Sequence, residues 1–427
     1  MTQPSMPKKN VRHIGLKSNT KTEESSSSLL NKKSTIIPDF LDSSLDIFST
    51  DISNQAIAFA NSAGLVEIFD PQNECKRLMT LAFGSGHAQS VMAMKFVSEG
   101  QLVTGDTGGN LCLYDLEVLR EKQQRQSSVQ GGRSSVKNYI GNPDLIIEEF
   151  DKDSINEDIP IRGILPSRRA SLYSQKQSSR SSISSPKFGI NCLDFNKQNS
   201  ILAIGQDRTI RLYDKQLMVR THITRRELNR CDNMEDSVLE GHSKTPHCCK
   251  FIDEDLFVTS GWDDCLKVWD RRCPELAVVS INGTHVCGPS IDVQPGSDNK
   301  VLCVGNWRST EGLQLWDLRK AGNSTAINNS HGVPESLLAT PKPNFDLEVK
   351  NGLPNQGHMI YAVRFLNRNV VLAGGSGEGA FMAVDVNRKE MVDSMDFKKR
   401  GINSISIGSN KIVVGGAKGA ARVIPID

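Results

Sequence analysis

One sequence unit recurs along the chain and constrains the fold more than any other feature. It consists of a short apolar strand, a second strand that ends at small residues, and a third strand that ends in an aromatic residue followed by aspartate. Seven segments fit the third strand, the last two more weakly: LVEIFD, LCLYD, IRLYD, LKVWD, LQLWD, FMAVD and ARVIPID, ending at Asp70, Asp115, Asp214, Asp270, Asp317, Asp385 and Asp427. Three such strands and an outer one make a four-stranded sheet, so the sequence predicts seven sheets.

The fourth unit contains the most complete set of motif residues. Gly241-His242 precedes its first strand, Asp263 lies at the turn before its third strand, and Trp269-Asp270 ends that strand. This spacing resembles that of WD-repeat proteins, and the fourth and fifth units are similar to a group of uncharacterised eukaryotic members. The resemblance implies an all-β fold, a seven-bladed WD-repeat β-propeller.

Four residues of this unit are implied by the resemblance to form a hydrogen-bonded set: His242, Thr259, Asp263 and Trp269. A buried imidazole, carboxylate or indole N–H destabilises the fold unless it has a partner, and partners joined in one network lock the loop to the strands. Other units depart from the pattern, since Gly108 replaces the turn aspartate in the second one. We expect such blades to form with weaker locking.

The last unit ends at its third strand and has no outer strand of its own. We expect the N-terminal strand at about 34–40 to supply it, because joining both chain ends in one blade closes the ring without a free sheet edge. The propeller would then extend over residues 34–427. Residues 1–33 are basic and serine-rich, and we expect a disordered tail there. Its PKKNVR run is either a nuclear address or solvated charge.

Two segments do not fit the repeats. Residues 120–187 form a long low-complexity insertion, in which DLIIEEF or IPIRGIL is expected to provide the outer strand of the second blade. Residues 320–356 form a loop insertion rich in proline and asparagine. Ser171 follows two arginines and Ser185 precedes a proline, so both are phosphorylation candidates, although a Ser/Arg tract also matches such patterns by composition.

Charge and motif spacing argue against several function classes. The chain has 51 Lys+Arg and 49 Asp+Glu, so its formal charge of +2 provides no overall attraction to nucleic acid or membranes. The runs GGSGEG and GGAKG lack the spacing of phosphate-binding loops. The run His247-Cys248-Cys249, and His285 with Cys287, suggest zinc but lack a C-x-x-C pair, so core packing is expected. We therefore predict no catalytic residues, no cofactor and no metal, and a protein that is not an enzyme.

The sequence shows neither the apolar run of a secretory signal nor a stretch of 18 or more apolar residues. Its ten cysteines lack a paired framework, and several lie in apolar runs, so we expect free thiols. Both observations predict a cytoplasmic or nuclear protein.

The turns between second and third strands are expected to ring one mouth of the propeller and to bind partners. The candidates there are Trp262, Trp307, Arg308, Arg208 and Lys418, with Lys244 on the neighbouring loop type. Exposed tryptophan and arginine carry much of the binding energy at protein interfaces. Because Trp262 and Trp307 occupy similar turns in adjacent blades, they either form one aromatic patch or each pack on their own blade.

Two consecutive units continue as W-D-x-R, which places Arg272 and Arg319 at equivalent positions. This pattern resembles the motif by which substrate receptors dock onto the adaptor of cullin-type ubiquitin ligases, although basic residues at this position also serve solubility. We predict a protein-interaction scaffold, with a ligase receptor as the alternative. The expected partners are other proteins, and we expect no small-molecule substrate, no membrane and no nucleic acid.

Overall fold

The computed structural model describes most of the repeat units. The described residues are 30, 35–36, 44–73, 75–82, 89–129, 140–141, 145–147, 189–196, 200–214, 219–223, 241–274, 276–298, 300–308, 311–319, 345–347, 359–376, 381–398 and 400–426. The expected tail therefore lies outside the described residues except for Leu30, and so do most of the two insertions.

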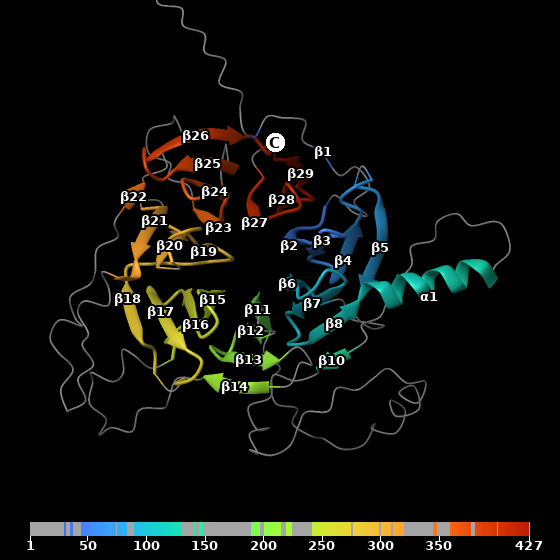
Figure 1. Cartoon of the computed structure of the whole chain (residues 1–427), viewed down its shortest axis with the longest axis horizontal. Helices are drawn as coiled ribbons and strands as arrows, with labels where there is room; N and C mark the ends of the chain where they lie inside the picture. Colours follow the sequence, from blue (N-terminus) through green and yellow to red (C-terminus); the bar gives the residue numbers. More distant parts are fainter. Residues whose placement is uncertain are drawn as a thin grey trace, which may run out of the picture.

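Seven sheets stand around a common axis and form a ring (Figure 1). We number them as blades 1 to 7 in chain order. Blade 1 contains β2 (Ile47–Ile52), β3 (Ile57–Asn61), β4 (Leu65–Phe69), β5 (Arg77–Ala82) and β9 (Ile140–Gly141). Blade 2 contains β6 (Val91–Phe96), β7 (Gln101–Asp106), β8 (Leu111–Asp115) and β10 (Leu145–Ile147). Blade 3 contains β11 (Ile190–Phe195), β12 (Ser200–Gly205), β13 (Ile210–Asp214) and β14 (Val219–Ile223).

The remaining blades repeat this arrangement. Blade 4 contains β15 (Pro246–Phe251), β16 (Leu256–Gly261), β17 (Cys265–Asp270) and β18 (Val279–Asn282). Blade 5 contains β19 (Ile291–Val293), β20 (Val301–Gly305), β21 (Leu313–Asp317) and β22 (Phe345–Leu347). Blade 6 contains β23 (Ile360–Phe365), β24 (Val370–Gly375), β25 (Phe381–Asp385) and β26 (Glu390–Met395). Blade 7 contains β27 (Ile402–Gly408), β28 (Lys411–Gly416), β29 (Ala421–Pro425) and β1 (Thr35–Ile36).

The two ends of the described chain meet in blade 7. Its outer strand β1 pairs antiparallel with β29, with Thr35 opposite Val423 and Ile36 opposite Arg422. Every third strand expected from the aromatic-Asp pattern is present, and the expectation of a seven-bladed propeller is confirmed. Because the last blade combines strands from both ends of the chain, the ring is held closed by backbone hydrogen bonds.

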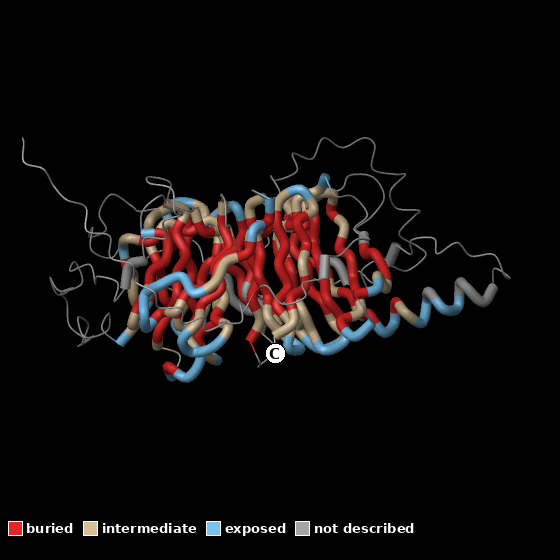
Figure 2. The backbone as a smooth tube through the Cα atoms, turned by 90° about the horizontal axis from the view of Figure 1, so that it is seen from above, coloured by how far each residue is buried: buried red, intermediate tan, exposed pale blue. Residues whose placement is uncertain are grey.

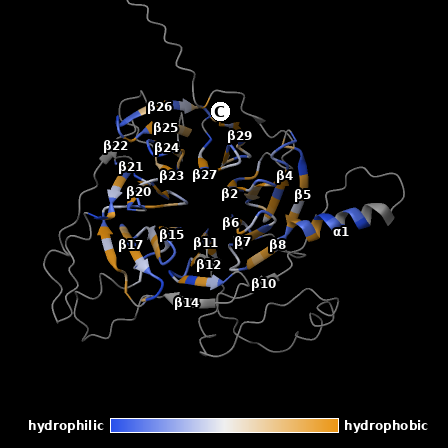
Figure 3. Ribbon diagram, viewed as in Figure 1, coloured by the Kyte–Doolittle hydropathy of each residue, from blue (hydrophilic) through white to orange (hydrophobic). Residues whose placement is uncertain are grey.

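The segment after blade 2 differs from what the sequence predicted. A helix, α1 (Leu116–Val129), begins there and covers the start of the expected low-complexity insertion. Asp115 caps it by accepting the backbone N–H groups of Glu117 and Val118. The first turn buries Leu116 and Leu119 against blades 1 and 2, while the following residues REKQQRQ are hydrophilic helix formers (Figure 3). This helix was not predicted from the sequence.

The same insertion supplies strands to two blades. From the DLIIEEF alternative, β10 pairs antiparallel with β8 as the outer strand of blade 2. The short strand β9 pairs parallel with β5 and gives blade 1 a fifth strand. The IPIRGIL alternative lies outside the described residues. The insertion thus crosses the outer edges of two neighbouring blades.

Seven clusters of buried apolar residues hold the ring together, one between each pair of adjacent blades. Figure 2 shows this buried layer between two more exposed rims. Close blade contact depends on small residues on the second strands. A Cβ added at Gly105, Gly305, Gly374 or Gly415 would lie 2.4 to 2.6 Å from an isoleucine of the next blade. Adjacent sheets can therefore pack tightly where glycine faces isoleucine.

Candidate functional site

The turns between second and third strands lie on one rim, because equivalent turns of an up-and-down meander fall on the same side of the ring. Trp262 lies in the β16–β17 turn and Trp307 in the β20–β21 turn. Their rings stack, with centroids 6.3 Å apart and planes 19° apart. The side chain of Trp262 is 39% exposed and that of Trp307 is half-buried. The structure thus brings the two tryptophans together in one patch across blades 4 and 5.

Two histidines extend this stack on both sides. The ring of His247, on β15, lies 4.6 Å from that of Trp262, and the ring of His285 lies 6.0 Å from that of Trp307, nearly parallel to it. Trp307 also donates its indole N–H to the hydroxyl of Tyr361 in blade 6, at 3.2 Å. We call His247, Trp262, His285 and Trp307 the aromatic rim. The two histidines and Tyr361 were not predicted as site residues, because they come from a strand, a loop and a third blade.

A charged group borders the aromatic rim. Asp264 accepts hydrogen bonds from the Arg308 guanidinium and from Nδ1 of His285, both at 2.7 Å. Partial burial opposes ionisation of Asp264, but the hydrogen bonds from His285 and Arg308 hold its pKa below the ordinary 3.8. Arg308 also contacts the carbonyl of Gly283. The predicted residue Arg308 is therefore held next to the stacked rings.

Burial also affects His247, whose Nε2 atom has no hydrogen-bond partner among the described residues. Desolvation lowers the pKa of His247 from 6.5 to about 4, although the negative charge of nearby Cys192 acts to raise it, and His285 adds a smaller lowering. The imidazole is therefore neutral at pH 7. A neutral ring can pack on Trp262 without the desolvation penalty of a buried cation.

The other predicted rim residues are not part of the aromatic rim, although Lys244 is next to Thr245, whose carbonyl accepts the backbone N–H of Trp262. Arg208 is exposed and donates to the carbonyl of Ser243, which places it beside exposed Lys244 at the boundary of blades 3 and 4. Lys418 is exposed in the β28–β29 turn, where its backbone N–H donates to Asp46. Arg208 and Lys418 have φ values of +70° and +52°. These basic side chains occupy the same rim by topology but form two separate positions.

The four residues of the blade 4 motif form one continuous chain of hydrogen bonds. The indole N–H of Trp269 donates to Thr259 Oγ1 at 2.8 Å, and Thr259 contacts His242 Nε2 at 2.6 Å. His242 Nδ1 lies 2.8 Å from Asp263 Oδ2 and must donate, because a carboxylate only accepts. His242 and Thr259 are fully buried. The structure brings these four together as a stabilising network beneath the rim.

The two W-D-x-R arginines lie on the opposite rim, in turns that follow the third strands. Arg272 makes a bidentate contact with Asp270, and Arg319 makes an equivalent one with Asp317. Arg272 also reaches Asp255 at 3.3 Å. Their side chains are 66% and 61% exposed. Each arginine is thus oriented by the aspartate of its own motif and remains open to solvent.

Several candidates cannot be placed. Ser171 and Ser185 lie outside the described residues. Among the described residues, no group of three or more His, Cys, Asp and Glu side chains is arranged to hold a metal ion. The described helix is too short and too polar to cross a membrane. The described residues of the rim that carries Trp262 and Trp307 offer a contact surface of stacked rings and paired charges.

Seven sheets in a ring, antiparallel apart from the β5–β9 pair, with the Trp–Thr–His–Asp network in one blade, define a WD-repeat β-propeller fold. The family model described as "WD domain, G-beta repeat" matches residues 75–115, 177–214 and 235–270. These segments include the third strands of blades 2, 3 and 4. The chain therefore contains WD40 repeats, and such repeats are typical of protein-interaction scaffolds.

Three relatives show how far the likeness extends. The chain is 24% identical to WD repeat-containing protein 37 of Homo sapiens over 61% of its own length and 47% of that protein. It is 26% identical to the Ribosome biogenesis protein WDR12 homolog of Drosophila mojavensis, over 29% of this chain and 34% of the relative. It is 26% identical to Telomerase protein component 1 of Mus musculus, over 33% of this chain and 5% of the relative. The matches thus span less than half the length of these relatives.

Proposed function

We propose that the protein is a non-enzymatic protein-interaction scaffold that binds other proteins on the aromatic rim. One observation carries the proposal: tryptophans from adjacent blades stack on each other while Trp262 remains 39% exposed. Rigid aromatic side chains lose little conformational entropy on binding and typically provide about 2 kcal/mol or more each at an interface hot spot. The site of action that we propose is the cytoplasm or the nucleus.

The charged group beside the rings supports the same surface. Arg308 is one-third exposed and Asp264 is half exposed, so both can contact a partner without leaving their mutual ion pair. Charges next to an apolar centre fix the orientation of a partner more than they add affinity. We therefore assign binding energy to the tryptophans and orientation to Arg308 and Asp264. The separate basic positions Arg208, Lys244 and Lys418 would contribute secondary contacts.

The test compares affinity purifications from cells that express tagged wild type or variants, with bound proteins quantified by mass spectrometry. In the Trp262→Ala/Trp307→Ala form, specific partners should decrease by about tenfold or more. The matched control is Met391→Ala/Val392→Ala, which removes two other exposed apolar side chains, on β26. A partner set that is unchanged in the tryptophan form, or lost equally in both forms, contradicts the proposal.

A second candidate function is that of a substrate receptor for a cullin-type ubiquitin ligase. It is favoured by the matching poses of Arg272 and Arg319, which are oriented by their own aspartates and more than half exposed. In this case a cullin adaptor should be recovered with wild type and with the tryptophan form. It should be lost in the Arg272→Ala/Arg319→Ala form. Absence of any adaptor from the wild-type purification eliminates this candidate.

A further inference from the structure

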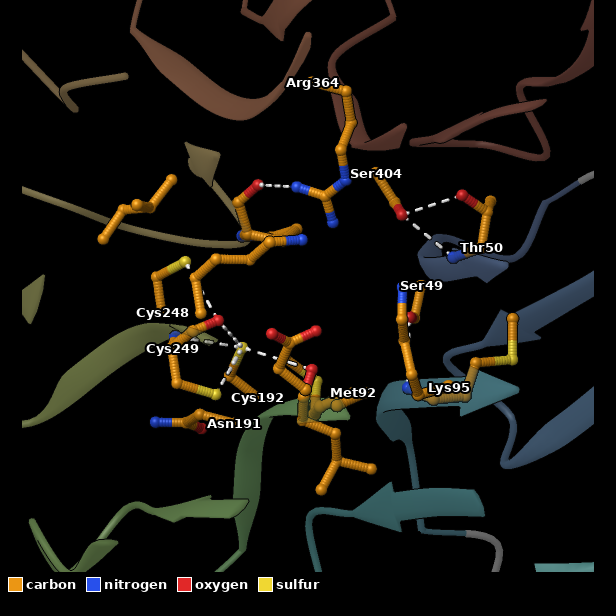
Figure 4. A pocket seen from close by; sticks show the side chains of 17 residues that line it. Ser49, Thr50, Met92, Lys95, Asn191, Cys192, Cys248, Cys249, Arg364 and Ser404 are labelled. Carbon is orange, nitrogen blue, oxygen red and sulfur yellow. Dashed lines mark hydrogen bonds between the residues drawn. The ribbon is translucent and has the colours of Figure 1, made fainter. Parts of the chain in front are cut away.

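The innermost strands of the blades enclose a cavity at the centre of the ring (Figure 4). Its empty volume is about 500 Å³ with the opening to solvent included. Charged side chains line it from several blades, among them Lys95, Lys250 and Arg364. Lys95 pairs with Asp51 and Lys250 with Asp292, each at 3.2 Å. The cavity is therefore lined by polar and charged groups as well as by the cysteines.

Three cysteines lie together on one side of this cavity. Cys192 comes from β11 of blade 3, and Cys248 and Cys249 come from β15 of blade 4 (Figure 4). The Sγ atoms of Cys192 and Cys249 are 3.5 Å apart, and the backbone N–H of Cys249 donates to Cys192 Sγ at 3.3 Å. Both thiols are free, and their sulfurs are in non-bonded contact but have to move closer to reach the roughly 2.05 Å of a disulfide.

The surroundings assign different roles to these thiols. Hydrogen bonds from the Cys248 and Cys249 thiols, with a smaller contribution from Arg364, hold the pKa of Cys192 well below its ordinary 9.0 despite burial. Burial raises the pKa of Cys249 well above that value. The thiolate is the form of cysteine that attacks an oxidant. Cys192 therefore has the environment of an attacking thiolate, and Cys249 that of a neighbouring thiol.

We propose that Cys192 and Cys249 form an oxidative modification site, at which a hydroperoxide such as hydrogen peroxide produces a disulfide between blades 3 and 4. The Cys192 thiolate attacks one peroxide oxygen, the O–O bond breaks, and hydroxide leaves. The sulfenic acid of Cys192 is then attacked by Cys249 sulfur, so that an S–S bond forms and the S–O bond breaks. The Cys249 proton leaves with the hydroxyl as water. The hydroxide takes up the proton that Cys192 lost on ionisation, so the two thiols lose two electrons in total and hydrogen peroxide is reduced to two waters.

Formation of this disulfide would make the stability of the propeller depend on the oxidant concentration. The new bond joins two inner strands that are 57 residues apart in the chain, and a cross-link over such a loop restricts the unfolded chain strongly. Oxidised protein should therefore melt several degrees above reduced protein. Blade 4, which would be cross-linked, also carries His247 and Trp262 of the aromatic rim.

The test treats the reduced full-length chain with stoichiometric hydrogen peroxide, blocks remaining thiols and digests with trypsin without reductant. Peptides 188–197 and 245–250 should appear joined, with the loss of two hydrogen atoms. Because peptide 245–250 contains both Cys248 and Cys249, fragmentation spectra and single variants identify the bonded sulfur. Cys303, buried on β20 of blade 5, is the matched control, and its peptide should be modified at least tenfold more slowly.

The variants separate the roles. Cys248→Ser and Cys303→Ser should keep the joined peptides, whereas Cys192→Ser and Cys249→Ser should lose them. In Cys249→Ser, a dimedone probe should label Cys192 as sulfenic acid. This label is read within a single variant, so it does not depend on how well the other variants fold. Unmodified thiols in wild type after treatment, or a joined peptide that survives Cys249→Ser, overturns the proposal.

Discussion

Blades 4 and 5 end their third strands in the same Trp-Asp pair but satisfy the buried indole differently. In blade 4 the Trp269 N–H donates across the sheet to Thr259, which continues to His242. In blade 5 the Trp316 N–H donates to Gln314 at 3.2 Å, two residues earlier on the same strand and thus on the same face. The strand register places Val304 where blade 4 has Thr259. The Trp-Asp ending therefore determines where the indole lies, and the neighbouring positions determine its partner.

The largest effect is expected when Thr259→Val gives blade 4 the side chain that blade 5 has. The substitution preserves shape but leaves the Trp269 N–H and His242 Nε2 buried without partners. Each unsatisfied buried group costs about 1 to 3 kcal/mol, so the free energy of unfolding should fall by about 3 kcal/mol. Urea denaturation measures this. Thr245→Val, which removes a half-buried hydroxyl from a rim loop, is the control and should change stability by less than about 0.5 kcal/mol. Equal, small effects would show that the blade 4 network is dispensable.

The contrast between these blades also explains what the sequence could predict. The blade 4 network was implied by the resemblance to WD-repeat proteins, which could be recognised because Gly-His, Asp and Trp-Asp lie at their spacing within one repeat. The partner of Trp316 could not be predicted, because Gln314 belongs to no motif. Gln314 takes the role that Thr259, on a neighbouring strand, has in blade 4. The fold itself was predictable because all seven third strands share one pattern, and strands with shared apolar faces must pack against each other.

The aromatic rim was only half predictable for a related reason. The turns that carry Trp262 and Trp307 could be recognised as equivalent, but stacking depends on the distance between blades, which the ring determines. His285 and Tyr361 reach the rim from a connecting loop and from blade 6, so no local spacing connects them to the tryptophans. Outer strands such as β10 were ambiguous because they lie within a polar insertion. The helix α1 could not be distinguished in the sequence, because its charged and polar composition resembles that of the insertion that follows.

The second-largest effect on stability is expected from acid, through His247 rather than His242 of blade 4. His242 has partners on both ring nitrogens, whereas His247 Nε2 has none among the described residues, and burial lowers the His247 pKa to about 4. The folded protein binds this proton more weakly than the unfolded chain does. Its contribution to stability is therefore full above about pH 6.5 and is lost as the pH falls towards 4. At pH 5 the loss from His247 should be about 2 kcal/mol.

His247→Phe tests this effect because it keeps an aromatic ring against Trp262 and removes the titrating group. Urea denaturation of wild type and variant at pH 7 and pH 5 gives the contribution of His247 as the difference between the two pH dependences. The variant should be less sensitive to acid by about 2 kcal/mol. If both proteins lose the same stability, His247 is not the buried neutral histidine described above.

A third change addresses blade 5 and should be smaller than the change in blade 4. Gln314→Met preserves length and burial but removes the acceptor of the Trp316 N–H. One orphaned polar group instead of two predicts a loss of about 1.5 kcal/mol, again measured by urea denaturation. Glu311→Gln, at an exposed turn position before the same strand, is the control. A loss as large as that of Thr259→Val would mean that the blade 5 indole is as central to its blade as the blade 4 network.

The smallest effect on stability is expected where the two blades meet at the rim. Arg308 of blade 5 binds Asp264 of blade 4, but the pair is one-third to one-half exposed, and such pairs contribute about 0.5 kcal/mol. Arg308→Ala should therefore change urea stability little, while the Asp264 pKa rises towards 3.8 in an NMR titration because one of its donors is lost. Partner recovery should nevertheless fall, because the group that orients the partner is gone. A residue whose loss hardly changes stability but reduces partner binding belongs to an interaction surface. If Arg308→Ala changes neither stability nor partner recovery, the stacked tryptophans alone make the contact with the partner.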